Sequence, residues 1–194
     1  MTQILGLTCI SEQLKEIDKK KYSFRTMTRK RFKDLCVRDG KDEAIKELSE
    51  RIAHNLYCTQ YILRHCHSSD IRHYRLSSSL FPLITDQTLE LSYADLPNHK
   101  TLDTELRFIG IIAKTFGISM GSHPDQFNVL ASLNKDAVNK SVNELNFQAS
   151  IFDKIGLPQD HTAPMNIHIN YTPKEAENLE LVATRFFRNL AMCE

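Results

Sequence analysis

The sequence has 194 residues, of which 41% are hydrophobic and 25% are charged, and its formal net charge is +1. This length and apolar content allow one buried core, so we expect a single domain over residues 1–194. No apolar stretch approaches the roughly 20 residues that span a bilayer, and the first residues lack a secretory signal pattern, which excludes a membrane partner and favours a soluble, cytoplasmic protein.

Short β-like runs alternate with helical patterns along the chain, which predicts parallel strands joined by crossover helices. A first strand over residues 4–9 precedes a basic stretch, residues 19–33, that contains Lys and Arg but no Asp or Glu. We expect this stretch to be a loop at the carboxyl end of the first strand, where it would contact phosphates. A merely solvated loop is the alternative, because the net charge of the whole chain gives no reason to expect a polyanion.

The following elements keep the same alternation. We expect strands over 71–76, 117–120 and 164–170, and helices over 41–64, over 102–116 with Thr101 as N-cap and Gly117 as its end, over 138–155 closed by Gly156 and Pro158, and over 173–192. This pattern predicts an α/β fold of the TIM-barrel type with about four strand–helix units. Four units cannot close an eight-stranded barrel, so we expect a half-barrel, a copy truncated at the C-terminus, or an open sheet.

Two histidines belong to different predicted strands: His123 follows the third strand and His168 lies in the fourth. Because the carboxyl ends of parallel strands meet at one edge of the sheet, both imidazoles would reach one face and bind a divalent metal. Asp86, in the loop after the second strand, is a candidate oxygen ligand on that face. The alternatives are hydrogen-bonded structural histidines and an aspartate that caps a turn or faces water.

A second group of candidate ligands lies toward the opposite edge of the sheet, and we assign it to structure. It comprises His65, Cys66, His67 and His73. The five cysteines of the chain are odd in number and form no CxxC pair, so neither a disulfide framework nor a thiolate zinc site is expected.

Gln126 and Phe127 follow His123 closely and pair an amide with an aromatic ring. An exposed ring can stack on a nucleobase while the amide hydrogen bonds to a base edge, which favours a nucleic-acid contact. A phenylalanine packed in the core beneath the loop is the alternative. Arg75 precedes a run of serines that would suit a phosphate, although serine runs are common.

Four blocks of the sequence resemble the UV damage endonucleases. They are residues 74–82 (YRLSSSLFP), 123–127 (HPDQF), 167–169 (IHI) and Arg25-Thr26 after the first strand, and their order agrees over essentially the whole chain. The resemblance implies a TIM-barrel DNA repair enzyme with a divalent-metal cluster, typically of manganese. Its substrate would be UV-damaged double-stranded DNA, nicked immediately 5′ of pyrimidine dimers and related lesions.

The resemblance also implies roles for individual residues. His123 and His168 match metal-binding histidines of the family, and Asp86 stands where a histidine ligand is usual. Gln126 and Phe127 match the pair that probes the distorted strand, with Phe127 in place of tyrosine. Further DNA contacts are implied for Arg25, Arg75 and Leu7, where Leu7 stands in place of a second probing tyrosine.

The family's bridging glutamate and its later metal ligands come from strands beyond the fourth, so a catalytic residue is expected only beyond Glu194. We therefore expect this chain, which would lack the C-terminal half of such an enzyme, to cut DNA poorly unless a partner chain or self-association completes the barrel. Two other readings stay open. One is a different metal-dependent TIM-barrel enzyme, such as a relative of the sugar isomerases, and the other is a non-catalytic remnant that binds damaged DNA.

Overall fold

The computed structural model describes residues 5–169, 171 and 178–193 and shows an α/β fold around a parallel sheet. The three strands of the sheet are hydrogen-bonded in chain order: β1 (Gly6–Thr8), β2 (His73–Leu76) and β3 (Ser119–Ser122). Helical crossovers separate consecutive strands, which is the connection that parallel pairing requires. The predicted alternation of strands and helices is therefore confirmed for these three strands.

The two faces of the sheet differ in polarity because side chains alternate along each strand. Tyr74 and Met120, which lie opposite each other in the register, are buried in the main apolar core. Arg75 and His73 project to the other face and are half-buried. This second face is polar and leads along β3 toward His123.

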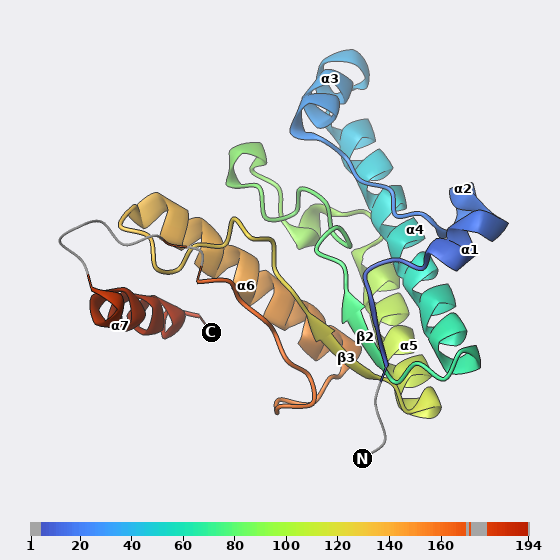
Figure 1. The fold of residues 1–194 in the computed structure, drawn as a ribbon. Coiled ribbons are helices and arrows are strands. Elements are labelled where there is room, and N and C mark those ends of the chain that lie inside the picture. Colours follow the sequence, from blue (N-terminus) through green and yellow to red (C-terminus); the bar gives the residue numbers. More distant parts are fainter. Residues whose placement is uncertain (1–4, 170, 172–177, 194) are drawn as a thin grey trace.

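Three long helices pack around the sheet. They are α4 (Lys41–Ser68), α5 (His99–Phe116) and α6 (Lys135–Ile155). Figure 1 shows α4 and α5 side by side, and α5 also packs against α6, so that residues of all three helices join the main apolar core. The helices α5 and α6 end where the sequence predicted. Gly117 follows α5 and Gly156 follows α6, each in the left-handed conformation that ends a helix, with φ of 63° and 80°.

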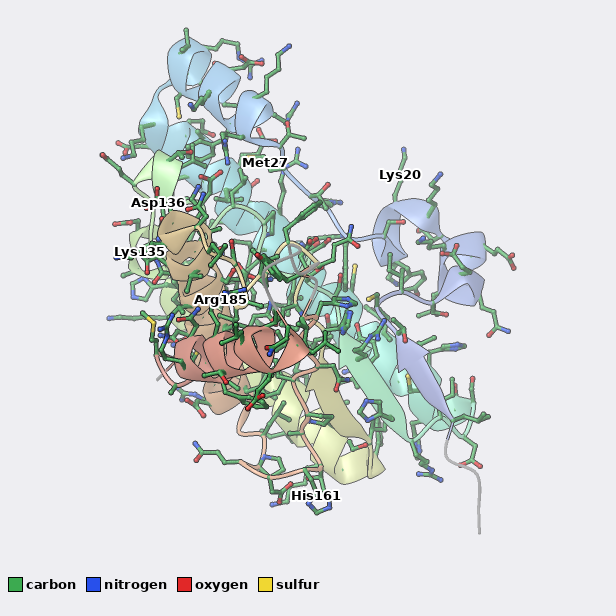
Figure 2. All side chains as sticks on the ribbon, turned by 60° about the vertical axis from the view of Figure 1, so that its left-hand side comes forward. Lys20, Met27, Lys135, Asp136, His161 and Arg185 are labelled. Atoms are coloured by element: carbon green, nitrogen blue, oxygen red, sulfur yellow. The ribbon has the colours of Figure 1, made fainter. Side chains whose placement is uncertain are left out.

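The prediction that residues 19–33 form one loop was wrong. Two helices occupy most of this stretch: α2 (Lys19–Tyr22) and the first half of α3 (Arg29–Asp39). A further helix, α1 (Glu12–Ile17), directly precedes it. The side chain of Asp18 caps α2 by accepting a hydrogen bond from the Lys21 N–H, and Thr28 caps α3 in the same way. The basic side chains other than that of Arg25 are thus displayed on helices, as Figure 2 shows for Lys20, which projects outward from α2.

The α5 helix begins earlier than predicted, because Asn98 rather than Thr101 is its N-cap. The carbonyl oxygen of Asn98 accepts the first hydrogen bonds, from the N–H groups of Thr101 and Leu102. Two short 3₁₀ helices precede it. They are η1 (Gln87–Leu89) and η2 (Tyr93–Asp95).

Residues 164–169 form no strand, which contradicts the prediction of a fourth strand there. Their only pairing with the sheet is an isolated parallel bridge between Ser122 and Met165. The Ser122 N–H donates to the Pro164 carbonyl oxygen at 2.9 Å, and the Asn166 N–H donates back to the Ser122 carbonyl oxygen at 3.0 Å. Proline has no N–H for a longer ladder, so four complete units are not confirmed.

The last helix, α7 (Leu179–Leu190), starts later and ends earlier than predicted. Pro173, predicted in its first turn, lies outside the described residues. Val182 and Phe186 pack with apolar residues of α6 in a second, smaller core. Arg185, labelled in Figure 2, donates from Nε to the carbonyl oxygen of Ala131 and joins α7 to the loop before α6.

Within the described residues, no helix is both long and apolar enough to cross a membrane. All five cysteines are free thiols, and burial raises the pKa of Cys58 and of Cys66 to about 11. The second group of candidate ligands, which includes His67 and His73, makes structural contacts near the amino end of β2. The His67 ring stacks on Phe116, and His73 Nδ1 lies 2.8 Å from the hydroxyl of Ser119.

Candidate functional site

His123 and His168 meet at the carboxyl end of β3. Their Nε2 atoms lie 2.6 Å apart, and the two rings contact edge to face with centroids 4.3 Å apart. His123 directly follows Ser122, the last residue of β3, and the bridge from Ser122 to residues 164–166 aligns the second segment with the strand. His168 comes two residues after that bridge, which brings its imidazole to His123.

The environment of His123 favours a neutral imidazole. Burial lowers the pKa of His123, and the nearby charges of His168 and Arg75 lower it further, against a weaker backbone contact from Asn166. A neutral imidazole nitrogen is the form that binds a metal ion. The two imidazoles would supply two nitrogen ligands to a divalent ion once their Nε2 atoms, at hydrogen-bond distance in this structure, move apart.

Asp86 does not join the histidine pair. Its Oδ2 lies 2.6 Å from Arg29 Nε, and its Oδ1 accepts hydrogen bonds from the N–H and the hydroxyl of Thr88. Burial alone would raise the pKa of Asp86, but the hydrogen bonds from Thr88 and Arg29 lower it. No group of three or more His, Cys, Asp or Glu side chains in the described part of the chain is arranged to hold a metal. The role of Asp86 as a ligand stays a prediction.

Phe127 stands on the loop that leaves β3, and 77% of the residue is exposed. Asp125 shapes this loop, because its carboxylate accepts from the Phe127 N–H and its carbonyl oxygen accepts from Asn128, which is buried. The Val129 N–H donates to Ser141 on α6, which fixes the end of the loop. Phe127 is therefore not a core residue, and it projects beside Gln126, which is also exposed.

The three remaining predicted DNA contacts differ in their placement. Arg75 lies on the polar face of the sheet, near enough for its charge to affect His123. Arg25 is exposed on the segment between α2 and α3. Leu7 lies in the middle of β1, partly buried against the main core, so it is not displayed at the end of the strand.

A cavity of about 630 Å³ lies next to Phe127. Its walls come from the segment before α3, the loop after β2, and α6. The ion pair of Arg29 with Asp86 lies in its lining, together with Lys140 and Glu144 of α6. Glu144 also accepts a hydrogen bond from Thr85, which ties α6 to the loop after β2.

Sequence reasoning missed this cavity and the residue that joins two of its walls. Lys140 and Glu144 occur in an ordinary amphipathic helix and carried no signal. The residue that joins the two walls, Asn55, did carry a signal in the sequence. It interrupts the apolar stripe of α4 beside Leu56, and a buried amide requires hydrogen-bond partners.

The comparisons with known proteins agree with one another. A family model described as UV-endonuclease UvdE matches residues 3–192. The UV DNA damage endonuclease of Nostoc sp. PCC 7120 is 33% identical over 179 residues, which are 92% of this chain and 51% of that protein. The UV DNA damage endonuclease of Bacillus cereus strain B4264 is 26% identical over 166 residues, which are 86% of this chain and 48% of that protein.

Among solved structures, a crystal structure described as SacUVDE matches with a TM-score of 0.75 and 22% sequence identity. The match covers all of this chain and 57% of that chain, and it shows a shared fold. The chain spans about half the length of the curated relatives that it matches.

Proposed function

Because this chain belongs to the UV-endonuclease UvdE family, we propose that it serves DNA repair as an endonuclease that nicks UV-damaged double-stranded DNA 5′ of pyrimidine dimers and related lesions. One observation carries the proposal: the Nε2 atoms of His123 and His168 lie 2.6 Å apart, and His123 begins the loop that carries the exposed ring of Phe127. Imidazoles of this kind would bind a metal ion, and an exposed ring on the same loop would stack on bases.

His123 and His168 would hold a divalent ion, most simply Mn²⁺, through their Nε2 atoms. When bound, such an ion supplies Lewis-acid chemistry, since it polarises a phosphate and lowers the pKa of coordinated water. Two imidazoles are too few for a metal cluster, so further ligands would come from Asp86, if its pair with Arg29 opens, or from groups outside the described residues. The low pKa of His123 keeps its imidazole neutral near pH 7, ready for the ion.

Phe127 and Gln126 would contact the bases at the lesion. Extrusion of a base is least costly where damage has already weakened stacking, so an exposed ring selects lesions without reading sequence. Arg25 and Arg75 would bind phosphates on either side, which adds affinity but no sequence preference. Leu7, packed within β1, would contribute at most through the shape of the sheet edge.

We propose that this polypeptide alone cuts DNA weakly or not at all. Only two metal ligands converge in its described part, and it spans about half the length of its relatives. A partner chain or self-association would then supply the remaining ligands. A second candidate function, damage binding without catalysis, rests on the same shortage of ligands.

The deciding experiment is a nicking assay on UV-irradiated and unirradiated plasmid, with Mn²⁺ and with a chelator. His123→Ala and His168→Ala should abolish any metal-dependent incision, while His161→Ala, an exposed histidine outside the pair, should not. Robust incision by the purified chain would refute the need for a partner. Selective binding to the irradiated plasmid without incision would support the second candidate function, damage binding without catalysis. Equal binding to both plasmids would refute the proposed role in DNA repair.

A further inference from the structure

A buried asparagine on α4, Asn55, joins the segment that carries Arg25, a predicted DNA contact, to the loop after β2, which carries the serine run suited to a phosphate. Its side chain is 0% exposed. Its Oδ1 accepts a hydrogen bond from the Arg25 N–H at 2.7 Å, and its Nδ2 donates to the Arg25 carbonyl oxygen at 3.2 Å. The same Nδ2 donates to the carbonyl oxygens of Ser79 and Leu80, both at 3.2 Å. One amide therefore bonds the segment before α3 and the loop after β2.

These bonds replace secondary structure for the segment that carries Arg25. Residues 23–28 lie between α2 and α3 in no regular element, so their backbone groups need partners elsewhere. Asn55 satisfies both main-chain groups of Arg25, and Met27 anchors the segment in the core. In Figure 1 the connection between α2 and α3 runs along the first half of α4. The exposed side chain of Arg25 thus projects from a backbone that is held in place by the hydrogen bonds to Asn55.

The same two segments both line the cavity beside Phe127. Thr26 belongs to one segment and Ser79 to the other. Arg29, the first residue of α3, and Asp86 also join these two regions through an ion pair, in which 56% of the Arg29 side chain and 11% of the Asp86 side chain are exposed. The buried amide of Asn55 is the stronger of the two links, because loss of either of its groups would leave buried backbone polar atoms unpaired.

We propose that Asn55 is a positioning residue that sets the distance between Arg25 and the loop after β2, and so the spacing of the phosphate contacts on a bound DNA duplex. This inference rests on the proposed function, because it requires Arg25 to contact DNA. Asn55 is fully buried and would not touch the DNA itself.

The first test needs no DNA. Asn55→Ala should accelerate hydrogen exchange in residues 23–28, including the Arg25 amide, while α4 and the sheet stay protected. Gln60→Ala is the matched control, because Gln60 is a buried amide on the same helix that donates to Glu105 on α5 and touches neither loop. Unchanged exchange at residues 23–28 in Asn55→Ala would overturn the inference.

The second test is a double-mutant cycle with a short duplex that carries one thymine dimer, measured by fluorescence anisotropy at several salt concentrations. Asn55→Ala and Arg25→Ala should each weaken binding about tenfold, the effect of one charge-assisted hydrogen bond, and lower the salt slope by about 0.9. The double variant should bind no more weakly than either single variant. Asn55→Ser, which keeps one donor, should lose less and guards against a folding defect in Asn55→Ala.

Additive losses in the cycle, or an equal loss from Gln60→Ala, would show general destabilisation and overturn the inference. A wild-type chain that binds damaged and undamaged duplexes equally would instead refute the proposed function. Wild-type preference for the lesion together with unchanged binding by Asn55→Ala would refute the inference alone.

Discussion

Replacement of Gly121 by alanine should separate the two histidines. Gly121 lies in β3 where the backbone of Pro164 approaches most closely: a Cβ atom at this position would be 2.7 Å from the Pro164 carbonyl oxygen and 3.2 Å from its Cγ. Ordinary contact begins at 3.4 Å, so the segment must move away by about 0.7 Å. Pro164 precedes His168 by four residues and holds the bridge to Ser122, so the displacement reaches the histidine pair.

The expected cost follows from this displacement. Overpacking of this kind destabilises by about 1–3 kcal/mol, against a gain of up to about 1 kcal/mol from the lower chain entropy of alanine in the unfolded state. We expect a net loss of about 1–2 kcal/mol in the free energy of unfolding. Misplacement of His168 should weaken Mn²⁺ binding by about ten- to a hundredfold, as loss of supporting contacts does at other metal sites.

Urea unfolding followed by circular dichroism measures the first effect, and titration calorimetry with Mn²⁺ measures the second. Gly6→Ala is the matched control in β1, because its nearest neighbours would be atoms of His73 at 3.5 Å, an ordinary contact. If Gly121→Ala unfolds at the same urea concentration as the wild type and binds Mn²⁺ equally well, the close approach of Pro164 does not hold the histidines together.

Three further predictions concern separate parts of the molecule. Phe127→Ala should leave stability within about 0.5 kcal/mol of the wild type but reduce the preference for irradiated duplex in anisotropy measurements; an unchanged preference would exclude Phe127 as the probing ring. Burial would raise the pKa of Asp103, but its ion pair with Lys154 lowers it below the unfolded value. The stabilisation by this ion pair, about 1 kcal/mol, is therefore present near pH 7 and is lost as the pH falls below about 4. Asp103→Asn should reduce the loss of stability at acid pH, measured as the urea midpoint of unfolding against pH. An unchanged dependence of the urea midpoint on pH would contradict this prediction. Gly110→Ala should lower the melting temperature despite better helix propensity, because its Cβ would lie 1.9 Å from the Ile155 carbonyl oxygen; a raised melting temperature would show that α5 and α6 can separate freely.

The local pattern of the sequence determined much of the helical framework. The apolar stripe that includes Leu48 and Ile52 predicted α4, and Gly117 and Gly156 predicted the ends of α5 and α6, because a left-handed residue after an amphipathic run is a local signal. The error at residues 19–33 was also local in origin. Asp18, directly before the basic stretch, and Thr28, within it, are capping residues, but the charge of the stretch favoured the prediction of a loop.

Only the tertiary structure decided which side chains meet. The sequence offered His123 and His168 near strand ends and Asp86 in a loop as candidate ligands on one face, whereas the structure brings the two histidines together and pairs Asp86 with Arg29. Asn55 could be suspected of hydrogen bonding, but its partners lie 24 to 30 residues away. Periodicity reports which face of an element is buried, while contacts between distant loops depend on how helices and loops pack against one another, and no local pattern encodes that packing.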